Sequence, residues 1–260
     1  MNRLILSTVV AAIAAAPLSP VLAAACSKQS PAHTVALLEL YTSEGCSSCQ
    51  AADRFVSGLL KPGMTLDQVV PLSLHVDYWD YIGWKDVYAR AAFTERQRWL
   101  SALAGSRTIY TPEVFVGGRE SRDWAARSGV MAAVRRTNDR PAQADVAITL
   151  GTPTTAGLPV EINARAAQSG NLFIALYENG LVSKVAAGEN SGTELRHDHV
   201  VRQWFGPFAL SGNGNQPKAG WSQTIAMPSG AVYKNLGVAA FVQSTKGEIL
   251  QSLALPTCPG

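Results

Sequence analysis

The sequence predicts an α/β domain over residues 26–140, followed by a β-rich, sandwich-like extension over residues 141–260. In the first part, apolar runs of strand length alternate with segments whose apolar residues have helical spacing. This alternation predicts a sheet with helices packed on its faces. After Arg140-Pro141 the pattern changes to short apolar runs separated by Gly, Pro, Asn and Ser, which favours a small antiparallel sandwich.

The elements of the first part are expected in the order strand, helix, strand, helix, strand, helix. The first helix has the clearest pattern, because Ala52, Phe55, Val56 and Leu59 recur at helical spacing before Pro62-Gly63 ends it. The strands are expected at residues 34–41, 69–79 and 111–120, and the helices at 48–60, 86–105 and 124–138.

Five strands are expected in the extension, at residues 145–150, 158–166, 171–179, 221–227 and 236–244. Residues 193–204 carry the one pattern there that suggests a helix.

Residues 1–25 have the pattern of a secretory signal peptide. Arg3 precedes an apolar run over residues 4–16, and cleavage is expected in the alanine cluster that follows, after Ala23 or Ala25. The apolar run is shorter than the roughly 20 residues that a membrane-spanning helix needs. We therefore expect a periplasmic or secreted protein with no transmembrane segment after cleavage; the alternative is an uncleaved N-terminal anchor.

Export implies that the four cysteines form disulfides or carry dithiol chemistry, because disulfides persist outside the cytoplasm. Cys26 and Cys258 lie near the two ends of the mature chain. Chain ends are often close together at the surface, so we expect a disulfide between them. The alternative is a lipoprotein with its lipid on Cys26. That alternative leaves Cys258 unpaired and lacks a Leu three residues before the cysteine.

Composition excludes several classes of function. The net charge is +3, and no cluster of Lys and Arg is dense enough for nucleic acid; Arg135-Arg136 is expected to be a solvated helix end. No phosphate-binding loop, serine triad or pair of hydrolytic carboxylates is recognisable, and no cofactor is expected.

Cys46 and Cys49 are expected to form a second disulfide with redox chemistry. Cys46 would lie where a strand gives way to a helix, and the free N–H groups and dipole of a helix N-terminus favour a thiolate. Cys49 lies one turn further on, so that it can resolve a mixed disulfide formed by Cys46. The alternative is a static structural disulfide.

Two further features support redox exchange. Thr111-Pro112 introduces a short apolar strand, and thioredoxin-like folds place a cis proline at such a point, opposite the dithiol, where the preceding residue presents its backbone to the substrate. Glu39 is the single charge in the apolar run that leads to Cys46. A carboxyl buried behind a dithiol can take the proton of the resolving thiol, and an exposed position is the alternative.

This order of elements resembles the thioredoxin superfamily. Four segments resemble, more narrowly, the exported bacterial family catalogued as domain of unknown function 1223: LELYTSEGCSSCQAAD (38–53), LHVDYWDYIGWKD (74–86), YTPEVFVGGR (110–119) and GENSGTELRHDHVVR (188–202). The resemblance implies a thioredoxin-like domain with a β-rich extension, and implies no reaction. The chain has Gln50-Ala51 where the family pattern has Pro-Pro, and it lacks the aromatic-Cys-Gly-Pro-Cys form of thioredoxin.

By strand alternation His75, Asp77 and Trp79 share one face, at the end of a strand that should lie beside the dithiol. One interpretation is an active-site floor that positions substrate. Another adds His75 to the two thiolates as a copper or zinc ligand. The third is a buried, hydrogen-bonded histidine among aromatic side chains.

The sequence thus predicts a thiol–disulfide oxidoreductase whose partners are protein thiols or disulfides of the cell envelope. Cys46 would be the nucleophile, Cys49 the resolving thiol, Glu39 the proton acceptor and Thr111-Pro112 the substrate-binding backbone. The alternatives are a metal carrier that uses Cys46, Cys49 and His75, and a non-catalytic envelope protein that works through its β-rich half.

Overall fold

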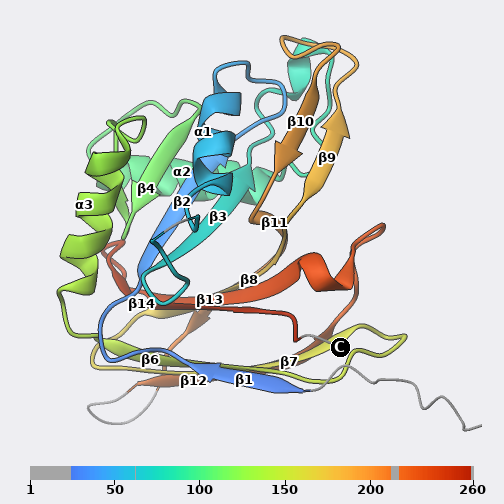
Figure 1. Ribbon diagram of the computed structural model, residues 1–260. Coiled ribbons are helices and arrows are strands. Elements are labelled where there is room, and N and C mark those ends of the chain that lie inside the picture. Colours follow the sequence, from blue (N-terminus) through green and yellow to red (C-terminus); the bar gives the residue numbers. More distant parts are fainter. Residues whose placement is uncertain (1–24, 62, 212–216, 259–260) are drawn as a thin grey trace, which may run out of the picture.

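The computed structural model describes residues 25–61, 63–211 and 217–258 (Figure 1). The predicted signal peptide lies, apart from its last residue, outside the described residues. Within the described ranges, no helix is both long enough and apolar enough to cross a membrane.

One mixed sheet of eight strands runs through both halves of the chain, in the order β14-β13-β8-β11-β3-β2-β4-β5. In its first-half portion β2 and β3 are parallel, and β4 is antiparallel to β2. The first half contributes β2 (Ala36–Thr42), β3 (Val69–His75), β4 (Glu113–Val116) and β5 (Arg119–Glu120). The second half contributes β8 (Asn171–Glu178), β11 (Val200–Ala209), β13 (Leu236–Gln243) and β14 (Ile249–Pro256).

Helices cover both faces of the first-half strands. The apolar sides of α1 (Cys49–Ser57) and α3 (Arg127–Asn138) pack on one face, against residues such as Leu38 and Leu40 of β2. On the other face, α2 (Ala91–Leu103) packs against Leu37 and Tyr41. Alternate residues of β2 therefore face different helices, and all seven residues of the strand are buried.

A second sheet of four strands packs against the second-half portion of the main sheet (Figure 1). The shared core includes Ile148 and Ile162 from the small sheet and Ile174 and Val238 from the large one. The small sheet has the order β1 (Cys26–Gln29), β6 (Ala144–Leu150), β7 (Leu158–Ala166), β12 (Lys218–Ile225).

A two-stranded ribbon stands beside α1 (Figure 1). It consists of β9 (Leu181–Lys184) and β10 (Glu194–His197), which pair antiparallel. Short 3-10 turns at Asp80–Ile82 and Tyr233–Asn235 complete the elements of the described residues.

The helix predicted at residues 193–204 is wrong, because these residues form β10 and the start of β11. His199, with φ 57°, separates the two strands; β10 pairs with β9, and β11 pairs with β8. The helix predicted from residue 86 begins at Ala91. The Asp86 carboxylate accepts a hydrogen bond from the Tyr88 N–H and so holds residues 86–88 in a turn. β1, β9 and β14 were not expected.

The predicted disulfide between Cys26 and Cys258 is present, with Cα atoms 6.0 Å apart. It joins β1 to the residues that follow β14, and both cysteines pack on the core between the two sheets. A Cys26 sulfur held in this bond is not available to carry a lipid. The boundary at residue 140 stays a prediction about folding units, since one sheet spans it.

Candidate functional site

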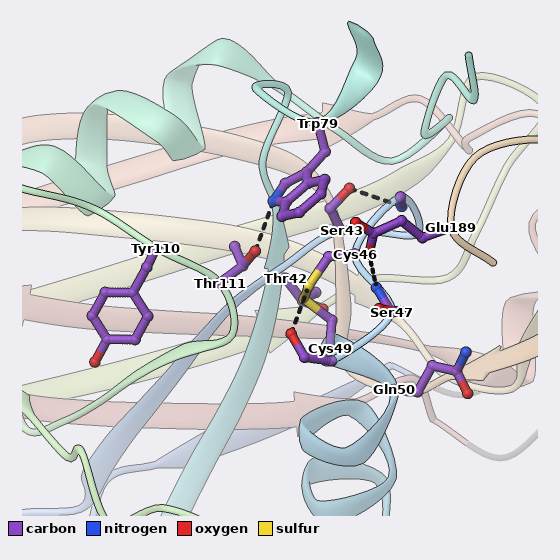
Figure 2. Close-up of a disulfide and its surroundings, with 12 residues drawn as sticks. Thr42, Ser43, Cys46, Ser47, Cys49, Gln50, Trp79, Tyr110, Thr111 and Glu189 are labelled. Carbon is purple, nitrogen blue, oxygen red and sulfur yellow. Dashed lines mark hydrogen bonds between the residues drawn. A yellow bond between two sulfur atoms is a disulfide. The ribbon is translucent and has the colours of Figure 1, made fainter. Parts of the chain in front are cut away.

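The dithiol lies where the sequence predicts, between the end of β2 and the start of α1. Cys46 and Cys49 form a disulfide with Cα atoms 5.4 Å apart (Figure 2). Cys46 is 1% exposed and Cys49 is 0% exposed, whereas Ser47 and Ser48 between them are exposed. The disulfide is therefore buried, although the two residues between its cysteines lie at the surface.

Three polar contacts fix this loop. The Ser48 hydroxyl lies 3.3 Å from the Cys46 sulfur, and the Cys49 N–H donates to the Cys46 carbonyl at 3.2 Å. The Ser47 N–H donates to a carboxylate oxygen of Glu189, at 3.0 Å. Of the backbone amides at the start of α1, those of Ser47 and Cys49 therefore already have partners.

The loop that precedes β4 lies beside the disulfide. The Thr111–Pro112 peptide bond is cis, as the sequence predicts. The Trp79 indole donates to the Thr111 hydroxyl at 2.7 Å, and both side chains belong to the surroundings of the disulfide (Figure 2). This hydrogen bond ties the segment after β3 to the segment before β4.

Glu39 does not lie behind the dithiol. Its side chain points with Leu37 and Tyr41 to the α2 face of the sheet, whereas the dithiol belongs to the α1 side. Arg96 of α2 donates to both carboxylate oxygens, at 2.5 and 3.1 Å. The Arg96 guanidinium also lies over the rings of Phe173, Trp204 and Phe241. Glu39 thus forms a buried ion pair with Arg96, because its position on β2 directs its side chain toward α2.

A cluster of buried ionisable side chains lies on the α1 side. Asp53 is one helical turn beyond Cys49 and accepts a hydrogen bond from the Thr42 hydroxyl at 3.0 Å. His197 of β10 lies 3.6 Å from Asp53 and 3.4 Å from Glu44, measured between nitrogen and carboxylate oxygen. The exposed fraction of every member is at most 6%: Glu44, Asp53, His75, Asp86 and His197.

Burial and close contacts together shift the pKa values of Asp53, His75 and Asp86. It raises the pKa of Asp53, and the nearby His197 and His75 offset only part of that rise. Burial lowers the pKa of His75, but the Asp86 carboxylate, 2.6 Å from Nδ1, outweighs it, so that the pKa of His75 is raised. The same contact outweighs burial at Asp86, whose pKa is lowered. His75 and Asp86 therefore form a buried ion pair, and the charged form of Asp53 is less favoured than it is in water.

His75 and Asp77, which were predicted to share one face, lie in different surroundings. His75 is 0% exposed, which fits the interpretation of a buried, hydrogen-bonded histidine and keeps it from touching a protein substrate. Asp77 lies beyond the end of β3, where its carboxylate accepts from the Thr94 hydroxyl of α2 at 2.6 Å. Among the described residues, no group of three or more His, Cys, Asp and Glu side chains is arranged to hold a metal ion.

Besides Glu44 and Asp86, four residues of the site escaped the sequence analysis. Asp53 had a usable signal, since it is an acidic residue four positions after Cys49 on a helix face that carries Ala52 and Val56. The other three come from the ribbon or its loop: Glu189, Asn190 and His197. No local pattern connects that segment with the dithiol, because pairing in the second half brings it there.

Comparisons with known proteins agree with this architecture. The profile of the family described as protein of unknown function (DUF1223) matches residues 37–243. No curated protein matches the chain. The crystal structure of protein AGR_C_4864 from Agrobacterium tumefaciens is similar, with a TM-score of 0.62 and 24% identity over 88% of this chain and 96% of that one. HBP35 of Porphyromonas gingivalis has a TM-score of 0.63 and 15% identity, over 87% of this chain and 76% of that one.

At these identities the two solved structures show a shared fold and nothing about activity. The family profile, in contrast, covers most of the sequence, including both cysteines of the dithiol and the ribbon beside it. This chain belongs to the DUF1223 family of proteins of unknown function.

Proposed function

We propose that the protein is an exported, thioredoxin-like thiol–disulfide oxidoreductase that acts on protein thiols or disulfides of the cell envelope. The observation that carries this proposal is the Cys46–Cys49 disulfide at the start of α1, with the Thr111 loop beside it. A disulfide that closes so short a loop adds little stability through chain entropy, so a chemical purpose accounts for it better than a structural one.

The thioredoxin-like assignment concerns residues 26–140. It is supported by the order β2, α1, β3, α2, β4, β5, α3 and by helices on both faces of a sheet whose first two strands are parallel. In this proposal the β-rich remainder, residues 141–260, extends the sheet and supplies the ribbon beside the dithiol.

The proposed reaction begins at Cys46. Its thiolate attacks a substrate disulfide, and Cys49 then attacks the Cys46 sulfur and releases the substrate. Because Cys46 is 1% exposed in the disulfide form, a substrate sulfur reaches it only when the residues around it move. Thr111 is the proposed backbone contact for the substrate, and Trp79 holds it through the hydrogen bond to its hydroxyl.

In this scheme Asp53 replaces Glu39 as the proton acceptor for Cys49. Asp53 is the buried carboxyl on the same helix as Cys49, one turn away, and its raised pKa suits a group that must bind a proton during the reaction. Glu39 is committed to Arg96 on the opposite face.

The two other functions that the sequence allows have less support. A metal carrier would need the Nε2 nitrogen of His75, which has no hydrogen-bond partner, aimed at both thiolates, and no metal-binding group is found among the described residues. A purely structural envelope protein would not need a dithiol that is covered by contacts from both halves of the chain.

The test is the redox equilibrium of the Cys46–Cys49 pair against glutathione, read by thiol alkylation and mass spectrometry. Cys26–Cys258 serves as the internal reference. We expect the dithiol to exchange while the terminal disulfide stays oxidised, and Cys46→Ser to abolish turnover of a protein disulfide. A pair that resists reduction as firmly as Cys26–Cys258 would disprove the proposal.

A further inference from the structure

A buried side chain links two loops near Cys46. One is the β9–β10 loop, residues 185–193, and the other is the dithiol loop, residues 43–48, between β2 and α1. Asn190 is 2% exposed. Its amide nitrogen donates to the carbonyl oxygens of Glu44, at 2.7 Å, and Cys46, at 3.2 Å. Its amide oxygen accepts from Gln50 at 2.6 Å. Both ends of the Asn190 amide are therefore used to hold the backbone around Cys46.

Two glycines let the same loop approach closely. Ile82 lies between Gly45 of the dithiol loop and Gly188 of the β9–β10 loop. A Cβ atom at either glycine would come within 3.1 Å or less of the Ile82 side chain. Gly188 also has φ +72°, which other residues rarely adopt. The β9–β10 loop is thus seated on the dithiol loop in one defined position.

This position brings Glu189 to the helix N-terminus. Its carboxylate accepts the Ser47 N–H, the amide directly after Cys46 (Figure 2). Hydrogen bonds from Ser47 lower the pKa of Glu189, so the carboxylate is charged at neutral pH. Free amides at this point would stabilise a Cys46 thiolate. Glu189 removes one such donor and adds a negative charge beside the sulfur, and both effects disfavour the thiolate.

We infer that Glu189, held in place by Asn190, biases the dithiol toward its disulfide form and makes the protein a donor of electrons to protein disulfides. This inference rests on the proposed function and adds the direction of electron flow. A dithiol protein is strongly oxidising when its reduced form is stabilised, and Glu189 acts in the opposite sense. Glu189 and Asn190 are positioning residues, because they act through Cys46.

The reaction in this direction is balanced. The Cys46 thiolate forms a bond to one sulfur of a substrate disulfide, and the other substrate sulfur leaves with the electron pair and takes a proton from solvent. Cys49 gives its proton to Asp53 and attacks Cys46, which breaks the mixed disulfide and releases the second substrate sulfur as a thiolate that takes a proton from solvent. The substrate gains two electrons and two protons, and the protein becomes the Cys46–Cys49 disulfide. A second dithiol, of a protein or a small molecule, must then return the protein to its reduced form.

The experiment compares wild type, Glu189→Gln and Glu194→Gln at low ionic strength. Glu194 is a matched control, since it is an exposed carboxylate on the same ribbon whose partner is Arg196. The readouts are the equilibrium constant for reduction by glutathione and the pKa of the Cys46 thiol. We expect Glu189→Gln to raise the equilibrium constant about threefold and to lower the thiol pKa, as for removal of one charge from a helix N-terminus. Glu194→Gln should leave both unchanged, and 1 M salt should shrink the Glu189 effect.

Asn190→Ala supplies a second test. If Asn190 seats Glu189, adding Glu189→Gln to Asn190→Ala should change the equilibrium constant less than Glu189→Gln does alone. The inference is overturned if Glu189→Gln matches wild type in both readouts, or if it shifts the equilibrium toward the disulfide. A wild-type pair that never equilibrates with glutathione would instead disprove the proposed function, so the two failures are distinguishable.

Discussion

The imidazole Nδ1 of His197 lies 3.6 Å from a carboxylate oxygen of Asp53, in a region where both side chains are buried. His197 ends β10 in the second half of the chain, and Asp53 lies on α1 directly after the dithiol. A side chain of the β-rich half therefore contacts the helix that begins at Cys49.

Asp53→Asn should make the protein more stable at neutral pH. The folded-state pKa of Asp53 is raised by burial, so the folded protein binds more protons than the unfolded chain between the ordinary pKa of an aspartate and this raised value. The free energy of unfolding therefore falls as pH rises through that window, and an uncharged asparagine escapes the loss. Urea unfolding of wild type and Asp53→Asn at a series of pH values measures how the free energy of unfolding depends on pH. The two curves should converge in acid; a variant less stable than wild type at pH 7 would contradict the expectation.

Asp53→Asn should also slow the attack of Cys49 on Cys46. A mixed disulfide of Cys46 with thionitrobenzoate reports this step directly, through the absorbance of the released thiolate. We expect the rate of thionitrobenzoate release at pH 7 to fall at least about tenfold, because a positioned base is lost. The variant should reach the wild-type rate only at higher pH. Glu39→Gln is the matched control, another buried carboxylate on the other face of β2. If Glu39→Gln changed this pH profile and Asp53→Asn did not, the proton acceptor would be Glu39.

Arg96→Met should destabilise the fold strongly. It leaves the Glu39 carboxylate buried without its partner, and removing one member of a buried ion pair costs about 3–5 kcal/mol. Arg98→Met, on the same helix, breaks an exposed pair with Glu95 and should cost less than about 1 kcal/mol. Chemical denaturation of the two variants checks the difference, and similar midpoints would show that the Glu39–Arg96 pair adds nothing.

The two disulfides should differ in what they contribute to stability. Chain entropy gives about 5 kcal/mol for a bridge that spans the sequence as Cys26–Cys258 does, and only about 2 kcal/mol for one that closes four residues. The double variants Cys26/Cys258→Ser and Cys46/Cys49→Ser, unfolded in urea, measure both values. A larger loss from Cys46/Cys49→Ser would mean that the dithiol is a structural staple after all.

The elements of the first half were predictable because their signals are local. Helical spacing in α1 and the proline before β4 can be recognised without knowing the rest of the fold. In the second half, the pattern at residues 193–204 suggested a helix, but its apolar residues belong to two strands. Their partners in β9 and β8 are remote from the local pattern that suggests a helix. Pairing across the sheet outweighed local propensity there.

Only the sequence motifs of the site could be predicted, and not the residues that the fold brings beside them. The cysteines and Thr111-Pro112 carry recognisable spacing, but Glu39 was assigned to the wrong face. All seven residues of β2 are buried, so no alternation of polar and apolar residues shows which side faces α1. His197 could not be assigned at all, because only the position of the ribbon beside α1 brings it to Asp53.

The bond between Cys26 and Cys258 turns almost the whole described chain into a closed ring. A protease that cuts one exposed loop between these residues opens the ring without releasing a fragment, and both pieces stay joined by the disulfide and by the sheet that they share. In an oxidising compartment a single nick therefore leaves the ribbon and the dithiol on one covalently connected molecule. Separation of the pieces requires both reduction and unfolding.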